Sequence, residues 1–577
     1  MSHFEEIVAF TDFNQPVFNE KKSIAVAFNG EIYNSKTLKE ELNIDENKFC
    51  TQTDAALVIH AYEQWGIEVL LNKLDGEFAF SLNDIANETL YIVRDKFGIK
   101  PLFYFQDKTG LYAASTLKLL SKHSFPKIIS KEGLNLFFSL SYIPAPYTIY
   151  ENVFKLPAGN YITIHNGHSA IKAYYRLEDH IAPSTLTFDE AKEKLKQMLS
   201  DSVKNYLRED APTGAFLSGG MDSSLVVGLM SKLSSKPVPT FSIGYKEKEF
   251  DESDQAQLVA NAFNTDHTVH FLSYADVMDV LDDIIDYFSE PFGNSSAIPS
   301  YYVAKLAKEK VKTVLAGDGP DELFGGYTKY LSEYYSNQYL RIPKPVRYLF
   351  EKAIRLFPDK SERISWIRKT KKLITNATFS KFEFIYRSMC LGCSDKERIQ
   401  LMKSEFYADI KPFIEKTYNR FISNDEINKS MLCDISIYWE GDGFPKVERM
   451  WALSSLTAHS PFLSADMVNF AISLPSAYKI NGKKKKYIIQ EAFKDLLPAK
   501  VLTYRKHGFT APVTHWLRKE LKQDLLNLLN KEKLTKQGIL NADAVSSIVE
   551  QHLKGNVDYG QLLWNLLVFE KWYAKNM

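Results

Sequence analysis

The sequence predicts two domains: an α+β domain of layered sheets, then an α/β domain built on a parallel sheet, whose C-terminal part is mostly helical. Three observations support this fold class. Short β-rich segments recur between residues 23 and 105, strands alternate with helices between residues 214 and 315, and the apolar spacing beyond about residue 330 is helical. A chain of 577 residues has room for both domains, which we expect at residues 1–180 and 187–577.

In the first domain, residues 23–34 predict a strand that ends in a polar turn. Residues 78–82, 90–93 and 102–105 predict further short strands, and Asn29-Gly30 and Phe97-Gly98 supply the turn residues. This pattern is typical of a layered α+β domain.

The second domain begins with a helix. Thr187-Phe188-Asp189-Glu190 is a capping box, and apolar residues follow it at helical spacing. The next predicted strands are residues 214–217, 238–245, 267–272 and 312–315, and the predicted helices are residues 223–233, 255–263, 275–288 and 301–309. Strands that alternate with helices predict a parallel sheet with right-handed crossovers.

Composition excludes several classes of protein. The 71 Lys and Arg residues balance 71 Asp and Glu residues, so the net charge gives no reason to expect nucleic-acid binding. The first residues lack the pattern of a signal peptide, and no apolar stretch is long enough to predict a membrane span. Four cysteines are too few for a disulfide framework here, so we expect a reduced, cytoplasmic protein.

The strongest chemical signal is the string Ser218-Gly219-Gly220-Met221-Asp222-Ser223-Ser224, between a predicted strand and a predicted helix. The two glycines let backbone N–H groups approach an anion, the serine hydroxyls add donors, and the helix N-terminus adds partial positive charge. Asp222 is placed to hold Mg²⁺ against phosphates. A Gly-Gly turn alone also fits an ordinary strand-to-helix turn, but the full string is more specific.

A second string, residues 317–327 (Gly-Asp-Gly-Pro-Asp-Glu-Leu-Phe-Gly-Gly-Tyr), follows another predicted strand. The carboxyl ends of neighbouring parallel strands share one crevice, so we expect both strings to face it. Asp222 and Asp321 would then hold the same metal ion.

The first string resembles the pyrophosphate-binding loop of N-type ATP pyrophosphatases, and the two strings in this order resemble the asparagine synthetase family, which includes β-lactam synthetases. The resemblance extends over nearly the whole chain. Its other strings are Phe28-Asn29-Gly30-Glu31-Ile32-Tyr33-Asn34, Leu74-Asp75-Gly76, Arg94-Asp95-Lys96-Phe97-Gly98-Ile99-Lys100-Pro101, Thr240-Phe241-Ser242-Ile243-Gly244, Glu290-Pro291-Phe292, Ser295-Ser296-Ala297-Ile298-Pro299, Lys446-Val447-Glu448-Arg449 and Pro461-Phe462-Leu463.

The resemblance implies an Ntn-hydrolase-like glutamine amidotransferase domain followed by a synthetase domain of the ATP-pyrophosphatase type, which binds ATP and Mg²⁺. Leu217, Ile243 and Gly317 fall where the family contacts adenosine. Lys486 falls at the family's lysine over the reacting phosphates, where an ammonium stabilises developing charge. Lys483 to Lys485, by contrast, are expected to be solvated.

The resemblance also suggests candidates for the general base. Asp318 occupies the position of a tyrosine that, with a glutamate, handles the proton of the attacking amine in β-lactam synthetases. Glu440, or alternatively Asp442, lies near the glutamate position.

The first domain departs from the glutamine-hydrolysing members, which begin Met-Cys-Gly and continue with an Arg-Gly-Pro-Asp string. Neither occurs here, so we expect a truncated domain without a nucleophile. Asn29 and Gly30 match the oxyanion-hole pair and Asp54 the glutamine-ammonium contact, as relics. Neither Ser2 nor Cys50 is expected to replace the nucleophile. The missing strand would expose a sheet edge, which a second copy, a partner protein or a rearranged loop would cover.

The acceptor side departs as well. Residues 455–464 lack three charged residues of the family pattern, and residues 439–445 carry two glycines and a proline where the family is helical. The substrate is therefore expected to differ from aspartate. His459 is expected to be a packed histidine, and Cys390 and Cys393 a coincidental pair. Residues 341–372 are basic with interleaved apolar residues. This pattern fits either solvated helices packed on the domain or a docking surface for a carrier protein, an anionic partner or a membrane.

The sequence thus predicts a ligase that uses ATP to adenylate a small-molecule or peptide carboxylate, releases pyrophosphate and transfers the acyl group to ammonia or an amine. We expect no glutaminase activity. The alternatives are an asparagine synthetase proper with an incomplete gene model, a specialised amide former such as a peptide cyclase or β-lactam former, and a non-catalytic subunit that needs a separate glutaminase.

Overall fold

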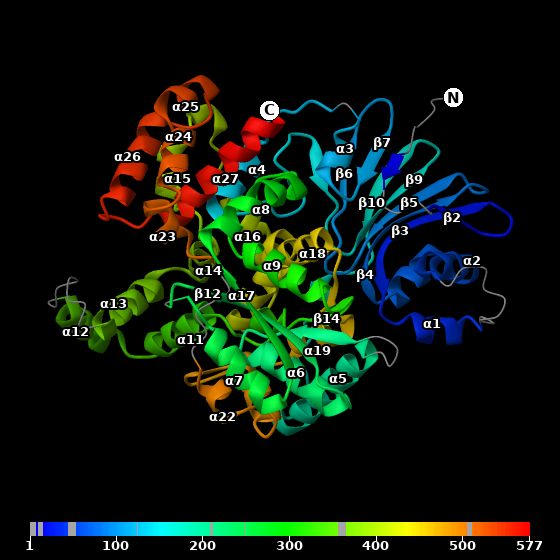
Figure 1. Cartoon of the computed structure of the whole chain (residues 1–577), viewed down its shortest axis with the longest axis horizontal. Helices are drawn as coiled ribbons and strands as arrows, with labels where there is room; N and C mark the ends of the chain where they lie inside the picture. The colour runs from blue at the N-terminus through cyan, green and yellow to red at the C-terminus, as the bar shows by residue number, and fades with distance from the viewer. Residues whose placement is uncertain are drawn as a thin grey trace.

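The computed structural model describes residues 7–9, 15–43, 53–123, 125–207, 212–248, 250–355, 365–504 and 511–577. Two β-sheets form the first domain, on the right in Figure 1. One is antiparallel, in the order β10-β9-β5-β4-β3-β2, and the other has the order β1-β7-β6-β8 with β1 parallel to β7. The strands are β1 (Ile7–Ala9), β2 (Val17–Phe18), β3 (Ile24–Ile32), β4 (Gly76–Asp84), β5 (Thr89–Arg94), β6 (Phe103–Gln106), β7 (Leu111–Ala114), β8 (Val153–Lys155), β9 (Asn160–His165) and β10 (His168–Ala173).

Helices α1 (Ser35–Glu41) and α2 (Asp54–Lys73) cover the outer face of the larger sheet (Figure 1). Strand β4 is buried on both faces because its neighbouring residues alternate between two clusters. Phe78 and Phe80 pack in the cluster under α2, whereas Ala79 packs with Leu90 and Leu111 between the two sheets. The predicted layers of the first domain are therefore present, and its four predicted strands correspond to β3, β4, β5 and β6.

The second domain is built on a five-stranded parallel sheet in the order β13-β12-β11-β14-β15. Its strands are β11 (Thr213–Phe216), β12 (Pro239–Tyr245), β13 (Asp266–Leu272), β14 (Thr313–Leu315) and β15 (Thr457–His459), and a small hairpin pairs β16 (Ile480–Asn481) with β17 (Lys484–Lys485). The surrounding helices are α5 (Phe188–Tyr206), α6 (Met221–Leu233), α7 (Ser253–Phe263), α8 (Tyr274–Phe288), α9 (Ala297–Lys308) and α10 (Pro320–Leu323).

Helices cover both faces of this sheet, because its strands are apolar on both sides. On one face, Val303 and Ala304 of α9 pack with Phe241 of β12. On the other, Leu225 of α6 packs in the large core with Leu217. All the predicted strands and helices between residues 214 and 315 are present, and α9 begins four residues earlier than predicted. At the start of α5, Thr187 and Glu190 make both hydrogen bonds of the capping box.

The C-terminal part is helical, as predicted. Its helices are α11 (Thr328–Leu340), α12 (Lys344–Arg355), α13 (Ser365–Thr378), α14 (Lys381–Met389), α15 (Asp395–Leu401), α16 (Lys411–Arg420), α17 (Glu426–Asp434), α18 (Phe444–Leu453), α19 (Ala465–Ser473), α20 (Ser476–Lys479), α21 (Tyr487–Phe493), α22 (Ala499–Thr503), α23 (Val513–Arg518), α24 (Lys522–Leu528), α25 (Lys531–Gln537), α26 (Ala542–Leu553) and α27 (Gly560–Asn576). Residues 435–443 form a π-helix between α17 and α18, in which a Cβ on Gly441 would lie 2.4 Å from the ring of Tyr142. No helix in the described ranges is long and apolar enough to span a bilayer.

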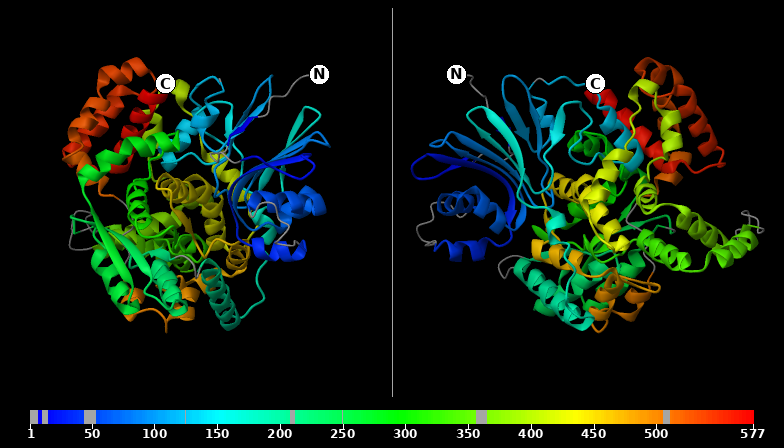
Figure 2. Two further views of the ribbon diagram at one scale, coloured as in Figure 1. Left: turned by 45° about the vertical axis from the view of Figure 1, so that its right-hand side comes forward. Right: turned by 180° about the vertical axis from the view of Figure 1, so that it is seen from behind.

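The two domains share one apolar core. Helix α4 (Lys131–Leu140) and α3 (Leu117–Leu120) of the first domain belong to the same cluster as α8 and α27 of the second. Figure 2 shows the sheets of the first domain packed along the flank of the helical body in both views. This continuous core fixes the orientation of the domains, so that side chains from both can contribute to one site.

Candidate active site

The first string forms a tight turn from β11 into α6. Gly219 has a φ of +74°, and a Cβ there would lie 2.7 Å from the backbone nitrogen of Ala256, so only glycine fits without strain. The hydroxyls of Ser218 and Ser223 lie 3.0 Å apart and cross-link the turn. Gly220 is the N-cap residue of α6 and offers no side-chain cap, which leaves the first N–H groups of the helix open toward the crevice.

Lys486 joins the two strings. It is buried at the N-cap of α21, directly after the β16–β17 hairpin. Its Nζ lies 2.6 Å from Oδ2 of Asp222 and 2.7 Å from Oδ1 of Asp321. The structure therefore brings together three predicted site residues that are as much as 264 positions apart in sequence. Lys483 and Lys484 are exposed, as expected for the rest of the lysine run.

Two glycines of the second string allow this close approach. A Cβ on Gly326 would lie 1.8 Å from Oδ1 of Asp321 and 2.1 Å from Cε of Lys486. A Cβ on Gly317 would lie 2.7 Å from the backbone nitrogen of Ser223. The two loops are thus packed backbone to backbone, and a larger residue at either glycine would separate them.

The residues present fit ATP with Mg²⁺. Oδ1 of Asp222 and Oγ of Ser224 are buried without a hydrogen-bond partner among the described residues. The carboxylates of Asp222 and Asp321 converge on the ammonium of Lys486, and Mg²⁺ is usually held by one or two carboxylates together with substrate phosphates.

The three residues expected at the adenosine lie on adjacent strands. Leu217 is buried after β11, and its carbonyl oxygen accepts a hydrogen bond from Ser242 of β12. Ile243 is buried on β12, and Gly317 follows β14. Both β12 and β14 pair directly with β11 in parallel, so the three residues lie near one another toward the carboxyl ends of these strands.

Glu322 is a buried acid beside this site that sequence reasoning missed. Its Oε1 accepts a hydrogen bond of 2.5 Å from the hydroxyl of Tyr327. Burial, followed by the nearby charge of Asp321, raises the pKa of Glu322 to about 7. Its position directly after Asp321 in the second string could have indicated a role at the site. Sequence alone does not tell which of two adjacent acids is buried. The backbone carbonyl of Asp318 accepts a 2.6 Å hydrogen bond from Ser460, which ties the second string to residues 455–464.

Glu440 points toward the first domain. Its Oε1 lies 2.6 Å from Nη1 of Arg94 and accepts a 3.1 Å hydrogen bond from the backbone nitrogen of Ala158. Burial raises the pKa of Glu440, and Arg94 opposes that shift. Asp442, from the same π-helix, accepts two 2.8 Å contacts from Asn294, and burial raises its pKa to about 6. Both candidate bases on the π-helix are therefore buried, Glu440 against Arg94 and Asp442 against Asn294.

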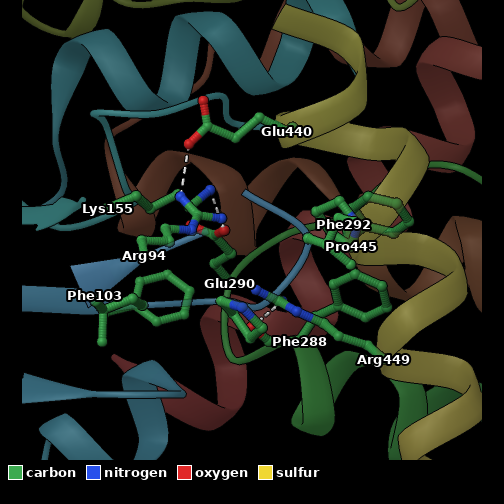
Figure 3. A pocket seen from close by; sticks show the side chains of 13 residues that line it. Arg94, Phe103, Lys155, Phe288, Glu290, Phe292, Glu440, Pro445 and Arg449 are labelled. Carbon is green, nitrogen blue, oxygen red and sulfur yellow. Dashed lines mark hydrogen bonds and ion pairs between the residues drawn. The ribbon is translucent and has the colours of Figure 1, made fainter. Parts of the chain in front are cut away.

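A charged cluster surrounds Glu440 at the domain boundary (Figure 3). Figure 3 shows the carboxylate of Glu440 directed at Arg94, with Arg449 reaching toward the main chain of Phe288. Lys155 of the first domain lies 2.5 Å from Glu290 of the second. The cluster encloses a cavity of about 10 Å³, room for a single water molecule. These paired charges stabilise the relative position of the domains.

The residues matched to the glutaminase lie in the first domain, on β3 and at the start of α2. Asn29 and Gly30 belong to β3, and a Cβ on Gly30 would lie 1.9 Å from the carbonyl oxygen of Glu77 on β4. Oδ2 of Asp54 accepts a 2.9 Å hydrogen bond from the nitrogen of Ile32. Ser2 and Cys50 lie outside the described residues.

His459 lies between the domains. Its ring stacks on Tyr206 at 4.7 Å, and its Nε2 is 3.3 Å from Glu31 of the first domain. These contacts fit the packed histidine that was expected. Cys390 and Cys393 are free thiols, and burial raises the pKa of each to about 12, so both are unreactive at neutral pH.

Comparisons with known proteins now identify the family. The family model for asparagine synthase matches residues 194–574, and the model for a glutamine amidotransferase domain matches residues 6–175. Asparagine synthetase [glutamine-hydrolyzing] 1 of Bacillus subtilis is 30% identical over 99% of this chain and 88% of its own length. A putative asparagine synthetase [glutamine-hydrolyzing] 2 of Methanocaldococcus jannaschii is 35% identical over 57% of this chain and 64% of its own.

More distant relatives include the amidase chyE of Penicillium rubens, 24% identical over 93% of this chain and 84% of its own. Among solved structures, a glutamine phosphoribosylpyrophosphate amidotransferase from B. subtilis covers 53% of this chain and 64% of its own at 13% identity, with a TM-score of 0.21, too low to carry an argument. The matches give a glutamine amidotransferase domain followed by a synthetase domain. The chain therefore belongs to the asparagine synthase family, whose members are carbon–nitrogen ligases that use ATP with Mg²⁺.

Proposed function

We propose that this chain is an ATP-dependent amide-forming ligase that adenylates a carboxylate, releases pyrophosphate and transfers the acyl group to ammonia or an amine. The observation that carries the proposal is the contact of Lys486 with both Asp222 and Asp321, at 2.6 and 2.7 Å, which assembles one anion- and metal-binding site from two loops. We place the synthetase domain at residues 187–577 and the amidotransferase-like domain at residues 1–180.

Each residue of the site has a proposed role. The turn of Ser218, Gly219 and Gly220, with the hydroxyls of Ser223 and Ser224, binds pyrophosphate through the open N–H groups of α6. Leu217, Ile243 and Gly317 line the adenosine side. Asp222 and Asp321 hold Mg²⁺, which supplies charge neutralisation at the phosphates when it is bound.

In the first half-reaction a carboxylate oxygen of the substrate forms a bond to the α-phosphorus of ATP, and the bond to the β-phosphate oxygen breaks. Lys486 stabilises the negative charge that gathers on the departing pyrophosphate. In the second half-reaction the amine nitrogen bonds to the acyl carbon, AMP leaves, and the amine loses a proton to a base. Asp318 is the nearer candidate for that base, because it belongs to the same loop as Asp321; Glu440 is the second candidate.

The carboxylate substrate differs from aspartate in this proposal. The strand β15 places His459 in a stack with Tyr206, where the family pattern has a charged residue. A small molecule or a peptide that carries a carboxylate remains the substrate class. The cytoplasm, which supplies ATP and Mg²⁺ and keeps thiols reduced, is the proposed location.

The 577 residues are proposed to hydrolyse no glutamine by themselves, because the sequence holds no cysteine before Cys50 to serve as the nucleophile. Asn29, Gly30 and Asp54 then have structural roles in the first domain. Ammonia or the amine reaches the synthetase site from solution or from a separate glutaminase.

The test is pyrophosphate exchange into ATP across a panel of carboxylates, with aspartate included. Exchange with at least one carboxylate is expected, and Asp222→Asn should abolish it while the exposed neighbour variant Lys484→Met leaves it unchanged. Exchange that survives Asp222→Asn would overturn the assigned site. No exchange with any carboxylate would favour a non-catalytic subunit.

A glutamine-hydrolysing asparagine synthetase is the second candidate, favoured by the names of the relatives at 30% and 35% identity. Incubation with glutamine, ATP and aspartate separates the two. Glutamate and asparagine released in equal amounts by this chain would establish the second candidate and reject ours.

A further inference from the structure

Helix α12 carries an uncovered apolar face at the periphery of the molecule. Figures 1 and 2 show α12 and α13 projecting from the helical body as a hairpin. Val346 is 55% exposed, Leu349 68% and Ile342, just before the helix, 40%. Val346 and Leu349 are three positions apart and lie on one side of the helix, and Ile342 adds an exposed apolar residue just before it. Exposed apolar residues that cluster in this way mark an interaction surface more often than isolated ones do.

The opposite face of α12 already has its partners within the fold. Ile354 is 4% exposed and packs in a small cluster with Tyr339 of α11 and Ile374 of α13. The hydroxyl of Tyr339 donates a 2.7 Å hydrogen bond to Glu351, and the guanidinium of Arg347 lies 5.7 Å from the Tyr339 ring. The hairpin is therefore held by its inner face, and the exposed apolar residues are not needed for its packing.

The charge of this region is unlike that of the rest of the chain. Residues 341–372 contain eleven Lys and Arg residues and three Asp and Glu residues, whereas the whole chain has 71 of each sign. Arg341, Lys344 and Lys352 are exposed and lie on or beside α12. Their long side chains extend away from the helix, so their charges can reach an anionic surface while the apolar side chains enter it.

We propose that the outer face of α12 docks peripherally on an anionic phospholipid membrane. A convex helix with a short apolar stripe, an exposed tyrosine (Tyr348, 64% exposed) and flanking cations matches an amphipathic helix at a bilayer interface. The excess positive charge selects anionic over zwitterionic headgroups. An acidic protein would meet the same charge, but an apolar stripe with flanking cations on a projecting hairpin suits insertion into a flat lipid interface.

Vesicle flotation of the full chain tests this proposal. The protein should float with vesicles of phosphatidylglycerol and phosphatidylcholine and remain behind with phosphatidylcholine alone. Raising the salt concentration should weaken binding, because it screens the attraction. The double variant Val346→Glu/Leu349→Glu should reduce bound protein about tenfold or more, and Lys344→Glu/Lys352→Glu should reduce it about fivefold or more for each residue.

The matched control is Ile128→Glu/Ile399→Glu. It introduces the same two negative charges in place of apolar residues that are 54% and 57% exposed elsewhere on the molecule. This control should bind vesicles like the parent chain. Equal binding to both vesicle types, or an equal loss in the control, would overturn the proposal. A chain that does not bind vesicles would also overturn it. If that chain self-associates and Val346→Glu/Leu349→Glu abolishes the self-association, the face joins two copies of the chain instead. Pull-down of a purified acidic protein without vesicle binding would also reject it.

Discussion

Lys486→Met separates the catalytic and structural roles of the lysine between the two loops. The substitution keeps the length of the side chain and removes its charge. In the folded protein the ammonium lies 2.6 Å from Asp222 and 2.7 Å from Asp321, and its side chain is 7% exposed. Methionine therefore removes a cation that contacts two carboxylates, and it removes the cation proposed for the departing pyrophosphate.

Both effects are large. Loss of one partner from a buried ion pair costs about 3–5 kcal/mol of unfolding free energy, mainly because the remaining charge is uncompensated. Loss of a fixed group that stabilises developing charge lowers the rate by about 10²–10³. Lys484→Met is the control, since its 53% exposed side chain contributes at most about 1 kcal/mol.

The double variant Lys486→Met/Asp222→Asn separates the loss of stability from the loss of pyrophosphate exchange. Neutralising one of the carboxylates should restore about half or more of the lost stability, measured by urea unfolding, because it removes much of the uncompensated charge. Pyrophosphate exchange should stay at the level of Lys486→Met or below, because the cation is still absent. Recovery of exchange together with stability would refute a direct role for Lys486 in the reaction. A stability unaffected by Lys486→Met would refute the buried pairing.

Gly326→Ala should abolish pyrophosphate exchange, because the added Cβ would lie 1.8 Å from Oδ1 of Asp321 in the proposed metal site. The control Gly443→Ala should retain exchange, because its added Cβ would lie 3.4 Å from the ring of Tyr438. Glu440→Gln should lower amide formation about 10²-fold but spare exchange if Glu440 is the base, and Arg94→Met should cost about 3–5 kcal/mol of stability in either case. The pKa of Glu322 rises from 4.5 to about 7 on folding, so the folded protein binds the proton more tightly. The contribution of Glu322 to the free energy of unfolding is therefore fully present below pH 4.5. It falls by on the order of 3 kcal/mol as the pH rises to about 7. Glu322→Gln should flatten that fall, as measured by urea unfolding at several pH values.

Each of these predictions has a contradicting result. Normal exchange by Gly326→Ala would mean that the two loops move apart freely. An equal loss of exchange and amide formation in Glu440→Gln would assign Glu440 to the domain boundary alone. An unchanged pH profile in Glu322→Gln would mean that water reaches the carboxyl group in solution.

Local sequence patterns were sufficient for the elements around the nucleotide site. The strands and helices between residues 214 and 315 follow from short apolar runs and turn residues, and α5 follows from a capping box, all of which act within a few residues. By contrast, β15 was not expected, because three residues gain strand conformation only from pairing with β14. The π-helix at residues 435–443 was also not expected, although its glycines indicated a departure from an ordinary helix.

The sequence alone determined the chemistry of this protein. The two strings and a lysine carry the residue types that bind phosphate and Mg²⁺, and the family follows from their order. The tertiary structure decided which of these groups meet. It joined Lys486 to Asp222 and Asp321, directed Glu440 to Arg94 instead, buried Glu322 and left one face of α12 uncovered. Such contacts depend on how distant segments pack, and burial then sets the pKa of each group, so no local pattern contains them.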